Sequence, residues 1–503
     1  MKPAILRDDF HLRKVNIIVP ICIMLPFVVA QLYIGTSIDI LFIAFCAYII
    51  PFFLLHVNGR DLFSILAATY SLRYVGIALI AKTFYGQSLE ENLFFPLEAY
   101  TLTLAFMIVT CLALLIIRSV SATSGRYPFP PEPQVLRRIS NVGLVIGFIG
   151  LVIVSTNKSR VAGEASSGPV FIIATAMMTA LYLSVICETL KGILESNGRG
   201  FITLRLILIY IVIIPFVIFM NTREFLLSSF IGVGITAFMY NAIKWRHILL
   251  VMVLAYFFMH IFTPITLYLR MGKEGLSTPQ YIEFISNTMT RLVGEDGFYD
   301  MIVESVEAAG KFNAANARAD AVQYDYYGDQ SNVLNRLSYV ALVDAVNNQM
   351  SYRIPLGMEV VDQDLIRILP SFVVSRGNDT NAVGMGDWLN WQIGLATPGR
   401  AYFSSFALPM EGLVTWGLVG FLGYQFFFIA LYLLACSTIS TFRVPLPASI
   451  YVYAATQHMF VEGAVSTLMA MMMRSLLFVA IMIYFIQMYA YSKNMKYGKL
   501  MRT

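Results

Sequence analysis

The segment 261–280 reads IFTPITLYLRMGKEGLSTPQ; within it a long series of apolar runs ends at Leu269 and a charged stretch begins at Arg270. Apolar runs of spanning length precede this point from Val15 onward, and they resume at about Phe406. About 20 consecutive apolar residues are needed to cross the hydrocarbon core as a helix. We therefore expect an all-α polytopic membrane protein with one large polar insertion late in the chain.

The composition agrees with this class. Of the 503 residues, 58% are hydrophobic and 13% are charged, and the mean hydropathy is +0.70, whereas soluble domains carry about 25% charged residues. All five cysteines fall in apolar runs, so the polar insertion holds no disulfide framework and no cysteine zinc motif. The formal charge of +5 is explained by basic loops and does not indicate a nucleic-acid partner.

Twelve transmembrane helices are expected, nine before the insertion and three after it. They divide the chain into a transmembrane bundle at 1–269, an insertion at 270–404, and a second membrane segment with its tail at 405–503. The expected spans are 15–35, 38–57, 62–81, 98–117, 140–156, 169–190, 201–220, 224–242, 247–268, 409–436, 445–462 and 466–491.

The insertion is expected to be a helical cap. Apolar residues in 332–348 recur at the spacing of an amphipathic helix, and 359–369 predicts a second helix that Pro370 ends. Two more helices are expected at 281–293 and 299–309.

Lys and Arg in the short connections set the orientation, because cytoplasmic loops carry the excess of positive charge. With the N-terminus in the cytoplasm, the short outer connections hold only Lys82, Lys158, Arg160 and Arg223. An odd number of spans then places 270–404 outside, in the periplasm of a bacterial inner membrane. Both termini are expected to be cytoplasmic.

Two charged residues lie at expected membrane boundaries. Arg223 lies at the outer tip between the seventh and eighth spans, where its guanidinium can either snorkel to headgroups or bind a specific anion. Glu411 lies where the chain re-enters the membrane, and a carboxylate there is unfavourable unless it is paired or used. Gly412, Gly417 and Gly420 follow it and allow close helix packing.

Other ionisable residues are weaker candidates, since each can equally form an ordinary salt bridge or hydrogen bond. His458 and Glu462 lie one helical turn apart in the eleventh span, and His260 lies near the outer part of the ninth. Histidine can act as a base near neutral pH. No nucleotide-binding, HExxH, GxSxG or CxxC motif is found in the sequence.

The order of short motifs across roughly residues 215–435 resembles the Wzy-type O-antigen polymerases. The similarity begins at the outer-tip arginine in NTREFLL at 221–227, passes through the insertion and ends at a glutamate followed by paired glycines. The later motifs are NRL at 335–337, RIPLG at 353–357, ILPS at 368–371, GR at 399–400, MEG at 410–412 and WGLVG at 416–420. The first 200 residues match only as generic spans.

This resemblance implies a polymerase that joins oligosaccharide repeat units on the outer face of the inner membrane. The growing chain, carried on undecaprenyl pyrophosphate, would be transferred to the sugar of a second lipid-linked unit, releasing undecaprenyl pyrophosphate. The implied partners are undecaprenyl-pyrophosphate-linked oligosaccharides, the lipid bilayer and a chain-length regulator; for the regulator the chain carries no motif.

The residues fit that chemistry, because an activated donor needs no nucleotide, and no cofactor or metal is expected. Arginine donates two parallel charge-assisted hydrogen bonds to a pyrophosphate leaving group, and a carboxylate can accept the proton of the acceptor hydroxyl. We expect Glu411 and Arg223 to act in catalysis. The expected pyrophosphate-binding residues are Arg223, Arg336, Arg400, Arg367 and Arg376, and the second group of candidates is Asp344, His260 and His458.

Three other classes stay open. An O-antigen ligase shares the donor, but it is expected to carry a histidine in the large outer loop, and 270–404 has none. A lipid-phosphate transferase of the GT-C type is expected to have a long first outer loop, whereas Gly35, Thr36 and Ser37 form a very short one. A transporter or flippase for lipid-linked oligosaccharides is expected to show repeated halves, which are not visible in the sequence.

A peptide tag inserted after Gly377 is expected to be accessible from the periplasm, because the positive-inside rule places 270–404 there. A tag after Gly125, in an expected inner connection, is the control and should be accessible only after the membrane is opened. Cytosolic exposure of the tag in 270–404 would remove the basis for a periplasmic reaction.

Overall fold

The computed structural model of the chain describes residues 14–121, 132–157, 169–220, 223–244, 278–293, 332–369, 384–396, 406–443 and 446–485, with single residues or pairs between them. In these ranges every regular element is a helix. The all-α fold is thus confirmed for the described part of the chain. Packing divides the chain into two compact units, one of 1–130 with 322–503 and one of 131–321. We call them the first and the second unit.

Among the described residues, seven helical segments are long and apolar enough to cross a membrane, by length and composition. Three shorter apolar helices coincide with further expected spans, and apolar side chains such as Val29 and Ile211 are 58% exposed on two of these, a surface that suits lipid. The seven segments are Ile38–Asn58, Leu62–Phe84, Pro96–Val120, Pro133–Thr156, Ile173–Glu195, Leu408–Ile439 and Val465–Phe485.

A multi-pass membrane protein is therefore indicated, while the number of twelve spans stays a prediction. Most of the expected ninth span, 247–268, lies outside the described residues. The expected eleventh span corresponds to a helix of only 16 residues, Pro447–Glu462.

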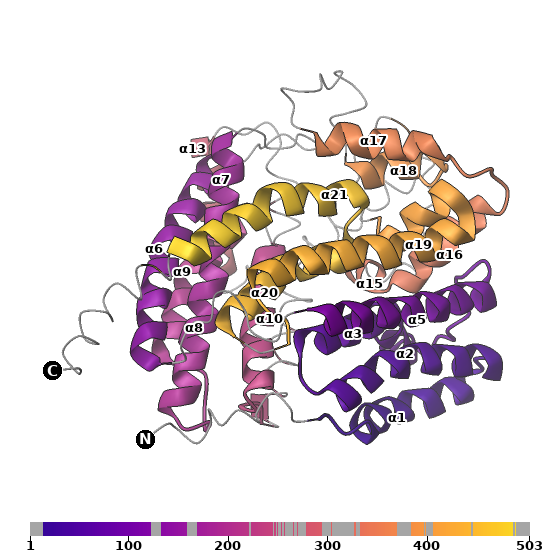
Figure 1. Cartoon of the computed structure of the whole chain (residues 1–503), viewed down its shortest axis with the longest axis horizontal. Helices are drawn as coiled ribbons and strands as arrows, with labels where there is room; N and C mark the ends of the chain where they lie inside the picture. The colour runs from indigo at the N-terminus through magenta and orange to yellow at the C-terminus, as the bar shows by residue number, and fades with distance from the viewer. Residues whose placement is uncertain are drawn as a thin grey trace. The chain divides into compact units, whose positions relative to one another are not determined.

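The first unit contains the helices at both ends of the chain (Figure 1). Its N-terminal helices are α1 (Ile18–Ile34), α2 (Ile38–Asn58), α3 (Leu62–Ser71), the π-helical turn η2 (Leu72–Gly76), α4 (Ile77–Phe84) and α5 (Pro96–Val120). Its later helices are α15 (Asn332–Leu337), α16 (Tyr339–Met350), α17 (Met358–Ile368), α18 (Met385–Gln392), α19 (Leu408–Ile439), α20 (Pro447–Glu462), α21 (Val465–Ala470) and the π-helical turn η4 (Met471–Leu476).

Helix α19 is folded back on itself near its start. The backbone leaves the helical conformation at Trp416 and Gly417, and Gly417 has a φ of +64°. The arm 408–415 then packs so closely on the rest of the helix that a β-carbon on Gly412 would lie 2.1 Å from the carbonyl oxygen of Gly420. Only glycine fits there. Glu411, which is expected where the chain re-enters the membrane, lies in the first turn of α19, within this short arm.

Two backbone hydrogen bonds stabilise the fold-back. The amides of Leu356 and Gly357 donate to the carbonyl oxygens of Val414 and Thr415, at 2.9 and 3.0 Å. These carbonyls lie where the arm stops being helical and would otherwise have no partner in an apolar surrounding. The connection before α17 thus satisfies the break in α19.

The insertion contributes helices that pack on the membrane helices of the first unit. Helix α16 contacts α5, η2 and α19, and α17 contacts α21. The helix expected at 332–348 is divided at Ser338 into α15 and α16. An amphipathic helix would leave one polar face exposed, but in α16 every residue from Tyr339 to Val346 is buried. Helix α16 is enclosed because neighbouring helices contact it on several sides.

The second unit contains α6 (Pro133–Asn157), α7 (Pro169–Met178), α8 (Ala180–Glu195), α9 (Leu204–Met220), α10 (Arg223–Met239) and α13 (Thr278–Val293) (Figure 1). Helix α6 packs along α7 and α8 through small residues. A β-carbon on Gly147 would lie 2.8 Å from the amide nitrogen of Leu181, and one on Gly150 would lie 2.5 Å from that of Met178. Such close approach is typical of helices packed within membranes.

The two packing units do not follow the three segments inferred from sequence. Residues 270–321 belong to the second unit and 322–404 to the first. Membrane sidedness and packing are separate properties, so the three-segment division stays a prediction about topology. The helix expected at 299–309 lies outside the described residues apart from Val303.

Replacing Gly420 by Ala is expected to destabilise the protein by about 1–3 kcal/mol, because the new methyl group would meet the backbone of Gly412. Thermal unfolding of the purified protein in detergent measures the effect. Gly423→Ala is the matched control in the same helix, because no atom lies within 4 Å of a β-carbon there, and it should leave stability unchanged or slightly raised. Equal behaviour of the two variants would contradict the fold-back.

Candidate functional site

Two carboxyl groups, which we call the carboxyl pair, meet at the start of α21. Glu411 of α19 is 0% exposed and Asp364 of α17 is 3% exposed. Glu411 accepts a hydrogen bond from the amide of Val465 at 2.8 Å, and Asp364 accepts one from the amide of Ser466 at 3.0 Å. Both amides belong to the first turn of α21, where the helix has unpaired N–H groups and a positive dipole end. The pair therefore caps a buried helix start.

The two side chains are also neighbours, and each influences the ionisation of the other. Two carboxylates cannot hydrogen-bond unless one of them carries a proton. Burial raises the pKa of Asp364 above its ordinary value, while hydrogen bonds from Glu411 and Ser466 and the charge of Arg367 act in the opposite direction. Close carboxyl groups in apolar surroundings are stabilised when they share one proton, so a shared proton is the hypothesis that this pair raises.

Arg367 lies one turn after Asp364 on α17 and contributes positive charge to both members of the pair. Its Nη1 donates to the carbonyl oxygen and the side-chain oxygen of Gln363, at 3.0 and 2.7 Å. Its guanidinium also lies over the ring of Trp388, 5.8 Å from the centroid. Helices α17 and α18 thus hold this arginine beside the carboxyl pair.

A second cluster, which we call the guanidinium network, consists of Arg73, Glu462 and His458. Glu462 of α20 forms a salt bridge with Arg73 of η2 and lies 3.4 Å from Nδ1 of His458, which confirms the expected one-turn spacing on α20. The Arg73 and Glu462 side chains are only 16% and 15% exposed. The Arg73 guanidinium lies 5.2 Å from the ring centroid of Tyr339, which is a cation–π contact.

The carboxyl pair and the guanidinium network are joined by the chain itself. Helix α20 ends at Glu462, and α21 begins at Val465 after the break at Gly463 and Ala464. Three residue steps span at most about 11 Å. Six ionisable side chains therefore lie around one helix break, which we call the α20–α21 break. They are Arg73, Asp364, Arg367, Glu411, His458 and Glu462.

An open groove of about 510 Å³ lies beside the fold-back of α19. Leu97 and Glu98 of α5, Met350 of α16, and Leu413 and Gly417 of α19 are among its lining residues. Arg353 also lines it and donates to the carbonyl oxygen of Gln392 at 2.9 Å. Because the carboxyl pair is buried, the groove does not expose it.

The structure describes one of the other candidate residues in full and the rest in part or not at all. Asp344 of α16 is 1% exposed and accepts bonds from the amides of Phe94 and Phe95, at 2.6 and 2.8 Å, so it caps the start of α5. Arg223 is the first residue of α10 and Arg336 lies in α15, but their side chains lie outside the description. Arg376, Arg400 and His260 lie outside the described residues.

Sequence reasoning missed Arg73 and Asp364. Arg73 had a readable signal, because an arginine in the middle of an apolar run is unfavourable unless it is paired or functional. The π-helical turn that carries it is a second feature frequent at functional sites. Asp364 had no such signal, since it is one of several acids in a polar segment. In the part of the chain that the structure describes, no group of three or more His, Cys, Asp or Glu side chains could hold a metal ion.

No protein-family model, curated protein or solved structure matches this chain. The resemblance carried by the short motifs therefore stays a hypothesis, and the functional argument rests on the residues themselves.

The raised pKa of Asp364 predicts a pH-dependent stability. The Asp364 carboxyl binds its proton more tightly in the folded state than in the unfolded state, where its pKa is about 3.9. The stabilisation that the protonated carboxyl gives the folded state is therefore complete below the unfolded-state pKa. It is lost as the pH rises through the folded-state pKa of Asp364. Asp364→Asn, which keeps the acceptor for Ser466, should flatten the dependence and exceed the wild type in stability at high pH.

Thermal unfolding in detergent between pH 4 and 9 measures this difference. Glu359→Gln is the matched control, because Glu359 is exposed on the same helix. A wild-type stability that rises with pH across the window, with the same slope in Asp364→Asn, would contradict a shared proton.

Proposed function

We propose that this chain is a membrane glycosyltransferase that joins undecaprenyl-pyrophosphate-linked oligosaccharide repeat units on the periplasmic face, as in the synthesis of O-antigen or a related surface polysaccharide. The observation that carries the proposal is the meeting of Asp364 and Arg367, from the insertion, with Glu411, from the membrane helix that follows it. Ionisable groups buried among membrane helices are functional candidates by default.

The reaction needs a group that takes a proton from the acceptor hydroxyl and groups that stabilise a pyrophosphate leaving group. The carboxyl pair can supply the first, since a pair that holds one proton can accept another. Arg367 is held beside the pair by Gln363 and Trp388, and it suits the second because its planar fork matches phosphate oxygens. In this proposal Glu411 acts with Asp364 rather than alone.

The guanidinium network is assigned a supporting role. Glu462 lies between Arg73 and His458 at the end of α20, so the network fixes the helix end that precedes the carboxyl pair. Buried ion pairs are costly to break from one side. The proposal for Arg223, Arg336, Arg376 and Arg400 as further pyrophosphate ligands rests on the sequence motifs.

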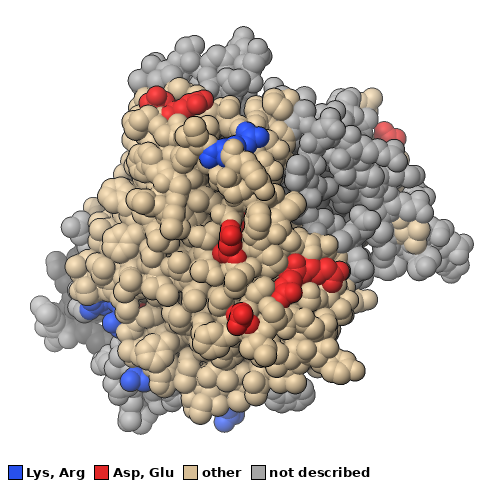
Figure 2. Space-filling model, turned by 90° about the vertical axis from the view of Figure 1, so that its right-hand side faces the viewer, with Lys and Arg blue, Asp and Glu red and all other residues tan. Residues whose placement is uncertain are grey.

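The charges of the first unit support the proposed orientation. At one end, Arg118 bridges Asp61 at 2.5 Å, and Arg443 donates to the carbonyl oxygen of Arg118 at 2.8 Å. At the opposite end, where α5 begins, Glu90, Glu91 and Glu98 are found. On the face in Figure 2, acidic side chains are scattered over a largely uncharged surface, and some Lys and Arg side chains are visible as well. Basic loops at one end are what the positive-inside rule expects of the cytoplasmic side.

A flippase for lipid-linked oligosaccharides is the second candidate. It is favoured by the interrupted helices α19 and α20–α21, because transporters use broken helices whose N-termini face the substrate site. In the first unit, however, the α21 start is already capped by two carboxyl groups. A capped helix start is a poor anion site, so the enzyme is the better-supported candidate.

The purified protein, supplied with lipid-pyrophosphate-linked repeat units and no nucleotide sugar, is expected to form a ladder of longer glycans on a gel. Glu411→Gln and Arg223→Gln should each lower the rate by about 100-fold or more, the usual scale of an acid–base or charge-stabilising group. Glu359→Gln is the control for a carboxylate on the cap and should retain activity.

Other products decide between the candidates. Transfer to a lipid A core would identify a ligase, and movement of the substrate across vesicles without a ladder would identify a flippase. Full activity of both Glu411→Gln and Arg223→Gln would refute the site while leaving the reaction open.

A further inference from the structure

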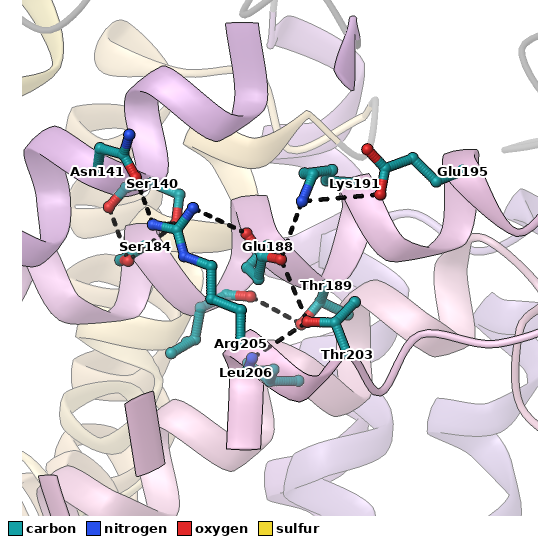
Figure 3. A network of polar contacts seen from close by, with 11 residues as sticks. Ser140, Asn141, Ser184, Glu188, Thr189, Lys191, Glu195, Thr203, Arg205 and Leu206 are labelled. Carbon is teal, nitrogen blue, oxygen red and sulfur yellow. Dashed lines mark hydrogen bonds and ion pairs between the residues drawn. The ribbon is translucent and has the colours of Figure 1, made fainter. Parts of the chain in front are cut away.

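The second unit contains a buried polar network that the proposed reaction does not use. Glu188 of α8 is 0% exposed, and its oxygens lie 3.2 Å from Nζ of Lys191, 3.2 Å from Oγ1 of Thr203 and 3.6 Å from Nη1 of Arg205 (Figure 3). Arg205, near the start of α9, also donates to the side-chain oxygen of Asn141 on α6. Helices α8 and α9 thus meet at one carboxylate between two cations, and α6 joins them through its contact with Arg205.

Arg205 forms one end of an open apolar groove. The groove has a volume of about 420 Å³ and runs between α6 and α9, along Val145, Phe148, Leu208 and Val212. Arg205 is the charged residue among the described side chains that line it. Its own side chain is 27% exposed. An exposed edge of a guanidinium at the end of an apolar groove offers a site for an anion attached to a hydrocarbon chain.

The surrounding charge is strongly positive. The ends of α6, α8, α9 and α10 that meet here fall in 132–143, 186–205 and 239–247, and Lys244 donates to the carbonyl oxygen of Arg199 across them. In these ranges seven basic residues face three acidic ones, Glu132, Glu188 and Glu195. The basic residues are Arg137, Arg138, Lys191, Arg199, Arg205, Lys244 and Arg246. Basic pockets between membrane helices attract acidic headgroups.

We propose that this groove binds one anionic phospholipid of the bilayer, with an acyl chain along α6 and α9 and the phosphate at Arg205. The charge excess selects an acidic headgroup, and the apolar lining selects a chain over a free phosphate. The site is independent of the proposed glycosyl transfer. By the positive-inside rule its lipid belongs to the cytoplasmic leaflet.

Native mass spectrometry of the full chain in detergent tests the site, with phosphatidylglycerol as the anionic probe and phosphatidylcholine as the zwitterionic one. One phosphatidylglycerol should be retained at low lipid-to-protein ratios, and phosphatidylcholine should not. Val212→Trp fills the groove and leaves the polar network intact, and it should weaken phosphatidylglycerol binding by about tenfold, the scale of a lost buried apolar contact.

Removing the charge at Arg205 needs a compensated variant, because Arg205→Gln alone would leave Glu188 buried with one cation fewer. Glu188→Gln with Arg205→Gln removes both charges and should also weaken binding by about tenfold or more. Arg137→Gln is the matched control, since Arg137 is exposed at the same end but does not line the groove. Thermal unfolding checks that each variant is folded.

The proposal is overturned if phosphatidylcholine is retained equally, because the groove would then be ordinary lipid annulus. It is also overturned if Arg137→Gln weakens binding as much as the double variant, since the charge effect would then be diffuse. Displacement of the lipid by glycerol phosphate would identify a free-anion site, and preferential retention of a polyprenyl phosphate would identify a carrier-lipid site.

Discussion

A helix that breaks in hydrocarbon leaves backbone amides and carbonyls without water, and each such group costs several kcal/mol unless the protein supplies a partner. In the described part of the first unit, two helix breaks are shielded from water by the protein itself. At the fold-back of α19 the partners are the amides of Leu356 and Gly357, which bond to the carbonyls of Val414 and Thr415. At the α20–α21 break they are the carboxyl groups of Glu411 and Asp364, which bond to the amides of Val465 and Ser466. Both sets of partners depend on residues that follow α16 in the insertion.

This requirement explains why structural and chemical roles meet in the same side chains. Glu411 reaches α21 because its arm is folded back at Gly417, and the arm can fold back because Gly412 and Gly420 have no side chains. Asp364 reaches the same helix start from α17. Two carboxyl groups brought together to cap a helix disfavour being charged at the same time when water is excluded. The carboxyl groups that cap the helix are thus the same groups to which the proposed function assigns proton transfer.

The buried charges follow one pattern in both units, considered separately. Two charge-paired groups show it: Arg73 with Glu462 and His458 in the first unit, and Glu188 with Lys191 and Arg205 in the second. An isolated charge in an apolar interior is strongly unfavourable, whereas a paired and hydrogen-bonded one is tolerated. These groups tie helices distant in sequence. Arg73 also lies in a π-helical turn, where one widened turn presents its side chain to α16 and α20.

The sequence by itself determined the all-helical membrane class and most helix positions. The length of an apolar run is a local property, and the thickness of the hydrocarbon core sets the length that a spanning helix needs. It also selected Glu411 and the spacing of His458 and Glu462, since a charge within an apolar run is visible without any fold. Only the tertiary structure decided that α16 is enclosed, that α19 folds back and that Asp364 joins Glu411. Those facts depend on contacts between residues far apart in sequence, such as Asp364 with Ser466, and on a close approach of Gly412 and Gly420 that no periodicity encodes.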